Sequence, residues 1–252
     1  MTRRYAILPV LAASAMAQNK VPEDRRNFIA CPIVRDTKTV PCFLAEYEGE
    51  LYYLGVQEDI GAPWFPPQQS HEVLVEGTVK AGPRVCGGIP LSALVTSVMP
   101  ELTRSCNTVL PARDDIPAPA DVFRGPGPGP STRPRETSAE SSPPFIVYFD
   151  FDNDQMRESA THIVRSAVSL AAVNHATHFE VTVSRGAVLL SNGRTVAENE
   201  FIATRRADKI AAQLKGLGVP PAALAIKIDN AAATPTGLND HTNRRALISV
   251  AP

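Results

Sequence analysis

The chain has 252 residues, 44% of them hydrophobic and 20% charged, with a formal net charge of −1 at pH 7. Because nucleic-acid-binding surfaces carry a basic excess, this balance argues against nucleic acid as a partner. After the first residues, no segment is long and apolar enough to span a bilayer as a helix, so no transmembrane span is expected.

Residues 1–17 have the pattern of a secretory signal peptide. The basic segment Met1–Arg4 precedes a short apolar run that starts at Tyr5, and a small-x-small site ends at Ala17. The run is far shorter than the ~20 apolar residues of a spanning helix, which favours a cleaved signal over a membrane anchor. No cysteine follows closely, so a lipoprotein is not expected. Loss of Arg3 and Arg4 would leave a slightly acidic chain, and we expect a periplasmic protein.

The cysteines agree with an oxidising compartment, because four in a small secreted domain usually form two disulfides. No Cys-x-x-Cys pair is present, so zinc is not expected. Three connectivities exist, and two of the cysteines flank the turn-like residues 35–38 as opposed hairpin positions would. The favoured pairing is therefore Cys31 with Cys42 and Cys86 with Cys106.

Residues 18–110 predict a small β-rich domain. Short runs with strand character are broken by turn residues, and they cover residues 27–34, 40–47, 50–56, 73–79 and the stretch around 85–89. About five such strands predict a small barrel or sandwich, and their number favours an oligonucleotide/oligosaccharide-binding-type (OB-like) barrel. Aromatic residues gather here, and core filling is preferred over a stacking platform for sugar or protein; they are Tyr47, Tyr52, Tyr53, Trp64 and Phe65.

Residues 111–144 predict a linker between two domains. Proline, glycine and serine dominate this stretch, as in the run Gly125–Pro130, and no helix or strand period is present. Such a composition buries too little apolar surface to offset the entropy cost of ordering. We therefore expect a tether of about 30 Å root-mean-square span when flexible.

Residues 145–252 predict an α+β domain of order βαβαββ, with two helices on one face of a mixed sheet. Apolar residues alternate in the expected strands and recur at three and four in the expected helices. The elements are a strand over 145–149, a helix from about Gln155 capped by Asn153 or Asp154, a strand over 179–183, a helix from about Ala197 ended by Gly216 and Gly218, and strands over 225–228 and 245–250.

Three short motifs lie at the ends of predicted strands or on a predicted helix of this domain. They are Phe149-Asp150-Phe151-Asp152 at a strand end, Asn199 followed by Arg205-Arg206-Ala207 on a helix, and Asn243-Arg244-Arg245 before the last strand. Together they resemble the OmpA-like C-terminal domain, which docks bacterial envelope proteins onto peptidoglycan. The resemblance implies the same βαβαββ sandwich and a location in the envelope of a Gram-negative bacterium, at the cell wall or outer membrane.

The resemblance also implies a ligand pocket. Arg206 matches the family arginine that pairs with a carboxylate of diaminopimelate in the peptidoglycan stem peptide. A guanidinium presents two parallel donors to a carboxylate, a geometry that lysine cannot copy. Four further matched positions are expected at the pocket, namely Asn199, Asp152, Asn243 and Arg244.

The sequence departs from the family at one position of this pocket. The family places an aspartate before the second helix, where it pairs with the ligand ammonium, but residues 181–197 contain no Asp or Glu, and Leu190 stands at the matching place. An acid from another direction could replace it, namely Glu198, Glu200 or Asp152. The alternatives are weak binding that relies on avidity, or a changed ligand.

Two functional hypotheses follow. The first is a periplasmic protein that associates non-covalently with peptidoglycan through the altered pocket. The second is an envelope scaffold or adaptor whose OmpA-like domain has lost that binding and contacts protein partners. Nucleophile motifs and phosphate-binding loops are absent, and His175 and His178 lack a third ligand, so no enzyme, cofactor or metal site is expected.

Overall fold

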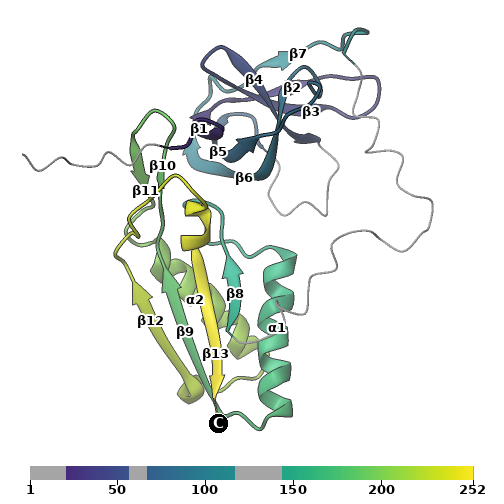
Figure 1. Cartoon of the computed structure of the whole chain (residues 1–252). Helices are drawn as coiled ribbons and strands as arrows, with labels where there is room; N and C mark the ends of the chain where they lie inside the picture. Colours follow the sequence, from purple (N-terminus) through teal and green to yellow (C-terminus); the bar gives the residue numbers. More distant parts are fainter. Residues whose placement is uncertain (1–20, 57–66, 117–143, 252) are drawn as a thin grey trace, which may run out of the picture.

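The computed structural model describes residues 21–56, 67–116 and 144–251 (Figure 1). The predicted signal peptide, Trp64, Phe65 and residues 117–143 of the predicted linker lie outside these residues. The described part consists of an N-terminal barrel (β1–β7) and a C-terminal domain (β8–β13 with its helices), each built on its own main sheet.

The N-terminal sheet closes on itself. Its strand order is β1-β5-β6-β4-β3-β2-β7, yet β1 and β2, near opposite ends of this order, are separated along the chain by Cys31 alone. One bent strand therefore joins the two halves into a barrel. Its strands are β1 (Arg25–Ala30), β2 (Pro32–Arg35), β3 (Cys42–Tyr47), β4 (Glu50–Val56), β5 (His71–Val79), β6 (Ile89–Leu102) and β7 (Val109–Leu110).

Strand β6 differs most from the sequence prediction, because the expected strand at 85–89 is a turn closed by hydrogen bonds between Val85 and Gly88. The strand begins at Ile89 and runs antiparallel to β5 and parallel to β4. Its prolines, Pro90 and Pro100, obscure the pattern in the sequence but lie near the two ends of the strand, where proline is tolerated.

All four cysteines form disulfides, as predicted, but the favoured pairing is wrong. Cys31 bonds Cys106, and Cys42 bonds Cys86. In the β2–β3 hairpin, Arg35 is the residue opposite Cys42, whereas Cys31 lies outside the hairpin at the bend between β1 and β2. Apparent symmetry about the turn therefore did not reflect the strand register, and each bridge instead links distant parts of the barrel.

The C-terminal domain has the predicted layers and, apart from one additional hairpin, the predicted order of elements. A mixed sheet of order β12-β9-β13-β8 carries α1 over β8 and β13, and α2 over β9 and β12 (Figure 1). Its core is built from alternate strand residues and one stripe of each helix. The elements are β8 (Phe145–Tyr148), α1 (Glu158–Val173), β9 (His178–Ser184), β10 (Ala187–Leu189), β11 (Thr195–Ala197), α2 (Ile202–Gly216), η1 (Pro221–Ala223), β12 (Leu224–Asp229), η2 (Asp240–Asn243) and β13 (Arg245–Ala251).

Both helices begin later than the sequence predicted, for one reason. Asn153 Oδ1 accepts the N–H of Gln155 and Asn199 Oδ1 accepts the N–H of Phe201, so each side chain closes a local turn before the helix. The space before α2 holds a hairpin, β10–β11, that the sequence prediction omitted. In Figure 1 this hairpin extends from the C-terminal domain toward the barrel.

Candidate functional site

Arg206, the predicted ligand-pairing residue, is fully buried on α2 and paired within its own domain. Its Nη2 and Nη1 donate to Glu198 Oε1 and Oε2 at 2.5 and 2.9 Å. The guanidinium also donates to the backbone carbonyl oxygens of Asn153, Asp150 and Ser184 at 2.9, 2.9 and 3.5 Å. The five N–H groups of the guanidinium thus have five acceptors from the chain itself.

The Glu198 carboxylate is the ion-pair partner of Arg206. Besides both Arg206 bonds, Oε2 accepts the Gly186 N–H at 2.6 Å and Oε1 accepts the Asp152 N–H at 2.9 Å. Removal of a carboxylate from water has a large free-energy cost, and here four charge-assisted hydrogen bonds offset it. Glu198 was considered from sequence as a partner for a ligand ammonium; in the structure it is instead the partner of Arg206. We call the site formed by the Arg206 guanidinium and the backbone N–H groups of Gly186 and Asp152 the Arg206 seat. The Glu198 carboxylate occupies this site.

Asp152 and Asn199 come together at the exposed margin of the Arg206 seat. Asp152 Oδ1 accepts the backbone N–H of Asn199 at 2.7 Å. Burial is the main cause that raises the pKa of Asp152 above the ordinary aspartate value, and the Asn199 hydrogen bond opposes it. Asn199 is exposed, whereas Asp152 is half-buried, so this pair faces solvent while the guanidinium behind it does not.

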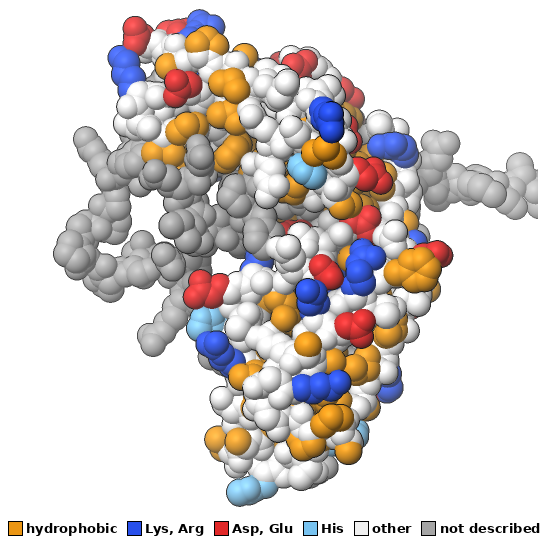
Figure 2. Space-filling model, turned by 180° about the vertical axis from the view of Figure 1, so that it is seen from behind, with side chains coloured by type: hydrophobic (Ala, Val, Ile, Leu, Met, Phe, Trp, Pro, Cys, Tyr) orange, Lys and Arg blue, Asp and Glu red, His pale blue; other side chains and the backbone are white. Residues whose placement is uncertain are grey.

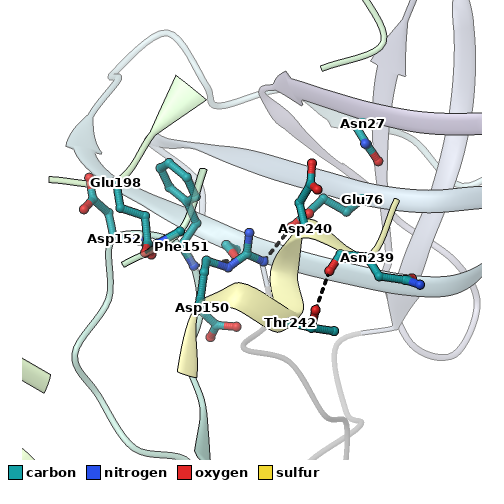
Figure 3. A network of polar contacts seen from close by, with 12 residues as sticks. Asn27, Glu76, Asp150, Phe151, Asp152, Glu198, Asn239, Asp240 and Thr242 are labelled. Atoms are coloured by element: carbon teal, nitrogen blue, oxygen red, sulfur yellow. Dashed lines mark hydrogen bonds and ion pairs between the residues drawn. The ribbon is translucent and has the colours of Figure 1, made fainter. Parts of the chain in front are cut away.

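Arg244 is also fully buried, but its partner belongs to the barrel. Its Nη2 donates to Glu76 Oε2 of β5 at 2.6 Å, and its guanidinium carbon lies 5.7 Å from the centre of the Phe151 ring (Figure 3). Asn243, the remaining predicted site residue, is half-buried at the end of η2. Glu76 was missed from sequence, although a charge in the apolar strand Val73–Val79 was a signal that a buried partner existed.

A second polar contact joins the barrel to the β10–β11 hairpin. Asn27 of β1 donates from Nδ2 to the carbonyl oxygens of Leu189 and Gly237, at 3.0 and 2.9 Å. Its backbone N–H donates to Ser191 Oγ at 2.9 Å, and the Ser191 N–H donates to the Asn27 carbonyl at 2.8 Å. The buried Asp240 (Figure 3) fixes this region by accepting the N–H groups of Leu189 and Gly237.

Apolar side chains from both domains share one buried cluster. Phe151 N–H donates to Ser97 Oγ of β6 at 2.9 Å, which fixes the ring against the barrel. Such shared burial is how two domains become one packed unit. The cluster contains buried Leu74, Phe151, Val188 and Leu190, with Ile29, Met99 and Val196 packed at its margin.

The aromatic residues of the barrel serve mainly its core. Tyr52 is buried, and Tyr47 stacks on Phe28 with ring centroids 4.7 Å apart and planes 11° apart. Tyr53 is half-buried beside a second cluster. These positions favour core filling over a stacking platform for the residues that the structure describes.

The face of the molecule drawn in Figure 2 shows no field of one sign. In Figure 2, acidic and basic side chains are interspersed over the visible face, in keeping with the near-neutral sequence. In the described ranges, no helix is long and apolar enough to cross a membrane. No cluster of three or more potential metal ligands lies within those ranges either.

Comparison with known proteins gives structural likenesses only. The OmpA-like domain of FopA1 from Francisella tularensis matches with 18% identity and a TM-score of 0.33, covering 42% of this chain and 71% of that one. The peptidoglycan-associated lipoprotein from Burkholderia pseudomallei matches with 20% identity and a TM-score of 0.33, and the match covers 45% of this chain and 98% of that one. The periplasmic domain of Helicobacter pylori MotB matches with 17% identity and a TM-score of 0.32, covering 42% and 69%.

No protein-family model matches the sequence, and no curated protein matches it. The structural likeness covers 42–45% of this chain. At 20% identity or less and TM-scores near one third, these likenesses carry no ligand or partner over to this chain.

Proposed function

We propose that this protein is a periplasmic envelope scaffold in which the OmpA-like domain holds the N-terminal barrel instead of a peptidoglycan stem peptide. One observation carries the proposal: Glu198 and three backbone carbonyls take all the donors of Arg206. The second family arginine, Arg244, is taken by Glu76 of the barrel. A ligand carboxylate would therefore have to displace a carboxylate that already makes four hydrogen bonds.

Co-sedimentation with purified, protein-free peptidoglycan tests this proposal. The mature protein should pellet no more than a carrier protein does, and excess free diaminopimelate should change nothing. Retention in whole envelopes should be abolished by protease treatment of the envelope, because the anchoring partners are proteins. Specific pelleting that free diaminopimelate competes away would contradict the proposal.

Peptidoglycan association remains the second candidate, favoured by the exposed margin of the seat. Asp152 and Asn199 lie together there, and the carboxylate of Asp152 is accessible enough to meet a ligand ammonium. In that case pelleting should fall in Asp152→Asn, whereas the exposed Asp208→Asn on α2 serves as a matched control that should not matter.

A further inference from the structure

The Glu198 carboxylate holds two backbone N–H groups, and each belongs to a segment that contacts the barrel. One is Gly186, just before β10, and the other is Asp152, just after the strand-end motif. The Glu198 backbone N–H also donates to the Gly186 carbonyl at 3.0 Å. A single side chain on the C-terminal domain therefore fixes two separate stretches of main chain.

The first stretch leads to the Glu76–Arg244 ion pair. A Cβ built on Gly186 would lie 2.5 Å from Arg244 Cγ and 3.4 Å from Glu198 Oε2. The Arg244 side chain thus packs directly against bare backbone at Gly186, on its way to Glu76 of the barrel. A shift of Gly186 would move the stem of Arg244 and lengthen the ion pair between the domains.

The second stretch leads to the apolar contact. Asp152 follows Phe151, whose N–H donates to Ser97 Oγ and whose ring packs in the shared cluster with Leu74. Asp152 itself has a positive φ of 53°, a conformation that a non-glycine residue holds only when its surroundings impose it. The Glu198 hydrogen bond is one of the contacts that impose it.

We propose that occupancy of the Arg206 seat by a carboxylate is coupled to docking of the barrel on the C-terminal domain. Glu198 is the resident carboxylate, and it acts as a positioning residue through Gly186 and Asp152. Without a carboxylate, the buried Arg206 loses its counter-charge and the two main-chain N–H groups lose their acceptor, so both barrel contacts loosen. A free carboxylate of small size that enters the emptied seat restores docking. This inference goes beyond the proposed function, since it holds whether or not peptidoglycan is bound.

The test uses amide hydrogen exchange on the full mature chain with Glu198→Ala. Glu200→Ala, on an exposed neighbour, is the matched control. Docking is reported by the amides of Asn27 and Ser191, which bond across the domains, and folding of the C-terminal domain by the amides of Val181 and Val183 in its central strand. In Glu198→Ala, exchange at the docking amides should rise about tenfold or more while the strand amides stay protected.

Formate is the probe for the emptied seat, with chloride at equal ionic strength as its control. Formate should slow the docking amides of Glu198→Ala back toward the wild-type rate and should leave wild type and Glu200→Ala unchanged. Unchanged docking in Glu198→Ala would overturn the coupling. If docking is lost in Glu198→Ala and formate restores it no better than chloride does, the claim that a free carboxylate can occupy the seat is wrong.

If Glu198→Ala loses protection throughout the C-terminal domain, Glu76→Gln tests the same coupling from the barrel side. Coupling free energy is reciprocal, so weakened docking must loosen the seat. The amides of Gly186 and Asp152, which bond Glu198, should exchange faster in Glu76→Gln. Wild-type rates at both would contradict the proposal. Neither experiment contains peptidoglycan, so their failure is distinct from failure of the proposed function.

Discussion

The buried Arg206–Glu198 pair combines a high desolvation cost with nearly complete hydrogen bonding. Each charge is expensive to remove from water, and only its partner and the surrounding backbone dipoles compensate. Arg206 also lies with its guanidinium carbon 4.8 Å from the centre of the Phe149 ring. Removal of one member would therefore leave the other as a buried charge without its partner, which is destabilising.

Replacement of Arg206 by Met should lower the free energy of unfolding by about 3–5 kcal/mol, because Glu198 stays buried without its counter-charge. The neighbouring Arg205 is exposed, so Arg205→Met should change the free energy of unfolding by less than about 0.5 kcal/mol. Urea unfolding with the disulfides intact measures both. Adding Glu198→Gln to Arg206→Met should recover part of the loss; equal effects of Arg205→Met and Arg206→Met would contradict the role of the ion pair.

At the scale of elements, periodicity predicted the main strands and both helices of the C-terminal domain well. Alternating and three-to-four patterns identify β9, α2 and β13, because burial on one face imposes those periods. The β10–β11 hairpin also had a local signal, the pair Asn192-Gly193 between apolar residues. The resemblance matched the nearby Leu190 to a pocket position, and no hairpin was predicted here. Cross-domain partners such as Glu76 leave no periodic trace.

The hairpin contact makes its own prediction. Ser191→Ala removes the acceptor of the Asn27 N–H, and an unsatisfied buried donor costs about 1–3 kcal/mol. Exchange of the Asn27 amide should therefore accelerate by about tenfold or more. Ser249→Ala, on an exposed position of β13, is the control and should leave that amide unchanged. If both variants match wild type, the Ser191 hydroxyl contributes nothing to docking.

The barrel elements are tied by disulfides of long loop length, which makes the Cys31–Cys106 bridge a large contributor. The bridge spans 75 residues, and closure of a loop of that size stabilises by about 4 kcal/mol in the chain-entropy model. Cys31→Ala/Cys106→Ala should lower the unfolding free energy of the barrel by roughly that amount or less. Peptide mapping without reduction should recover Cys31 with Cys106, and a Cys31–Cys42 peptide would refute the pairing.

At the scale of the whole molecule, the two domains share a seam that is apolar at Phe151 and charged at Arg244. Such a seam is specific but sensitive to added charge, because Phe151 and Arg244 are both buried away from water. His241 of η2 lies in this environment, near Glu76, Arg244, Arg25 and Asp240. A group there that gains charge without gaining a partner opposes docking.

Docking should therefore weaken as the pH falls. The pKa of His241 is lowered, and burial is the largest cause. The positive charges of Arg244 and Arg25 lower the pKa further, whereas the negative charges of Glu76 and Asp240 oppose the shift. The folded, docked form thus binds fewer protons than the open form below about pH 6.5, the ordinary histidine value, so its stability falls as pH drops through that value.

His241→Gln should remove this part of the pH dependence, because the amide cannot take up a proton. The pH dependence of docking is measured by amide exchange at Asn27 and Ser191. The exchange rates are corrected for intrinsic rates and compared between pH 7.5 and 5.5. His178→Gln, at the exposed start of β9, should keep the wild-type profile. If His241→Gln also keeps the wild-type profile, His241 is not the source of the pH dependence of docking.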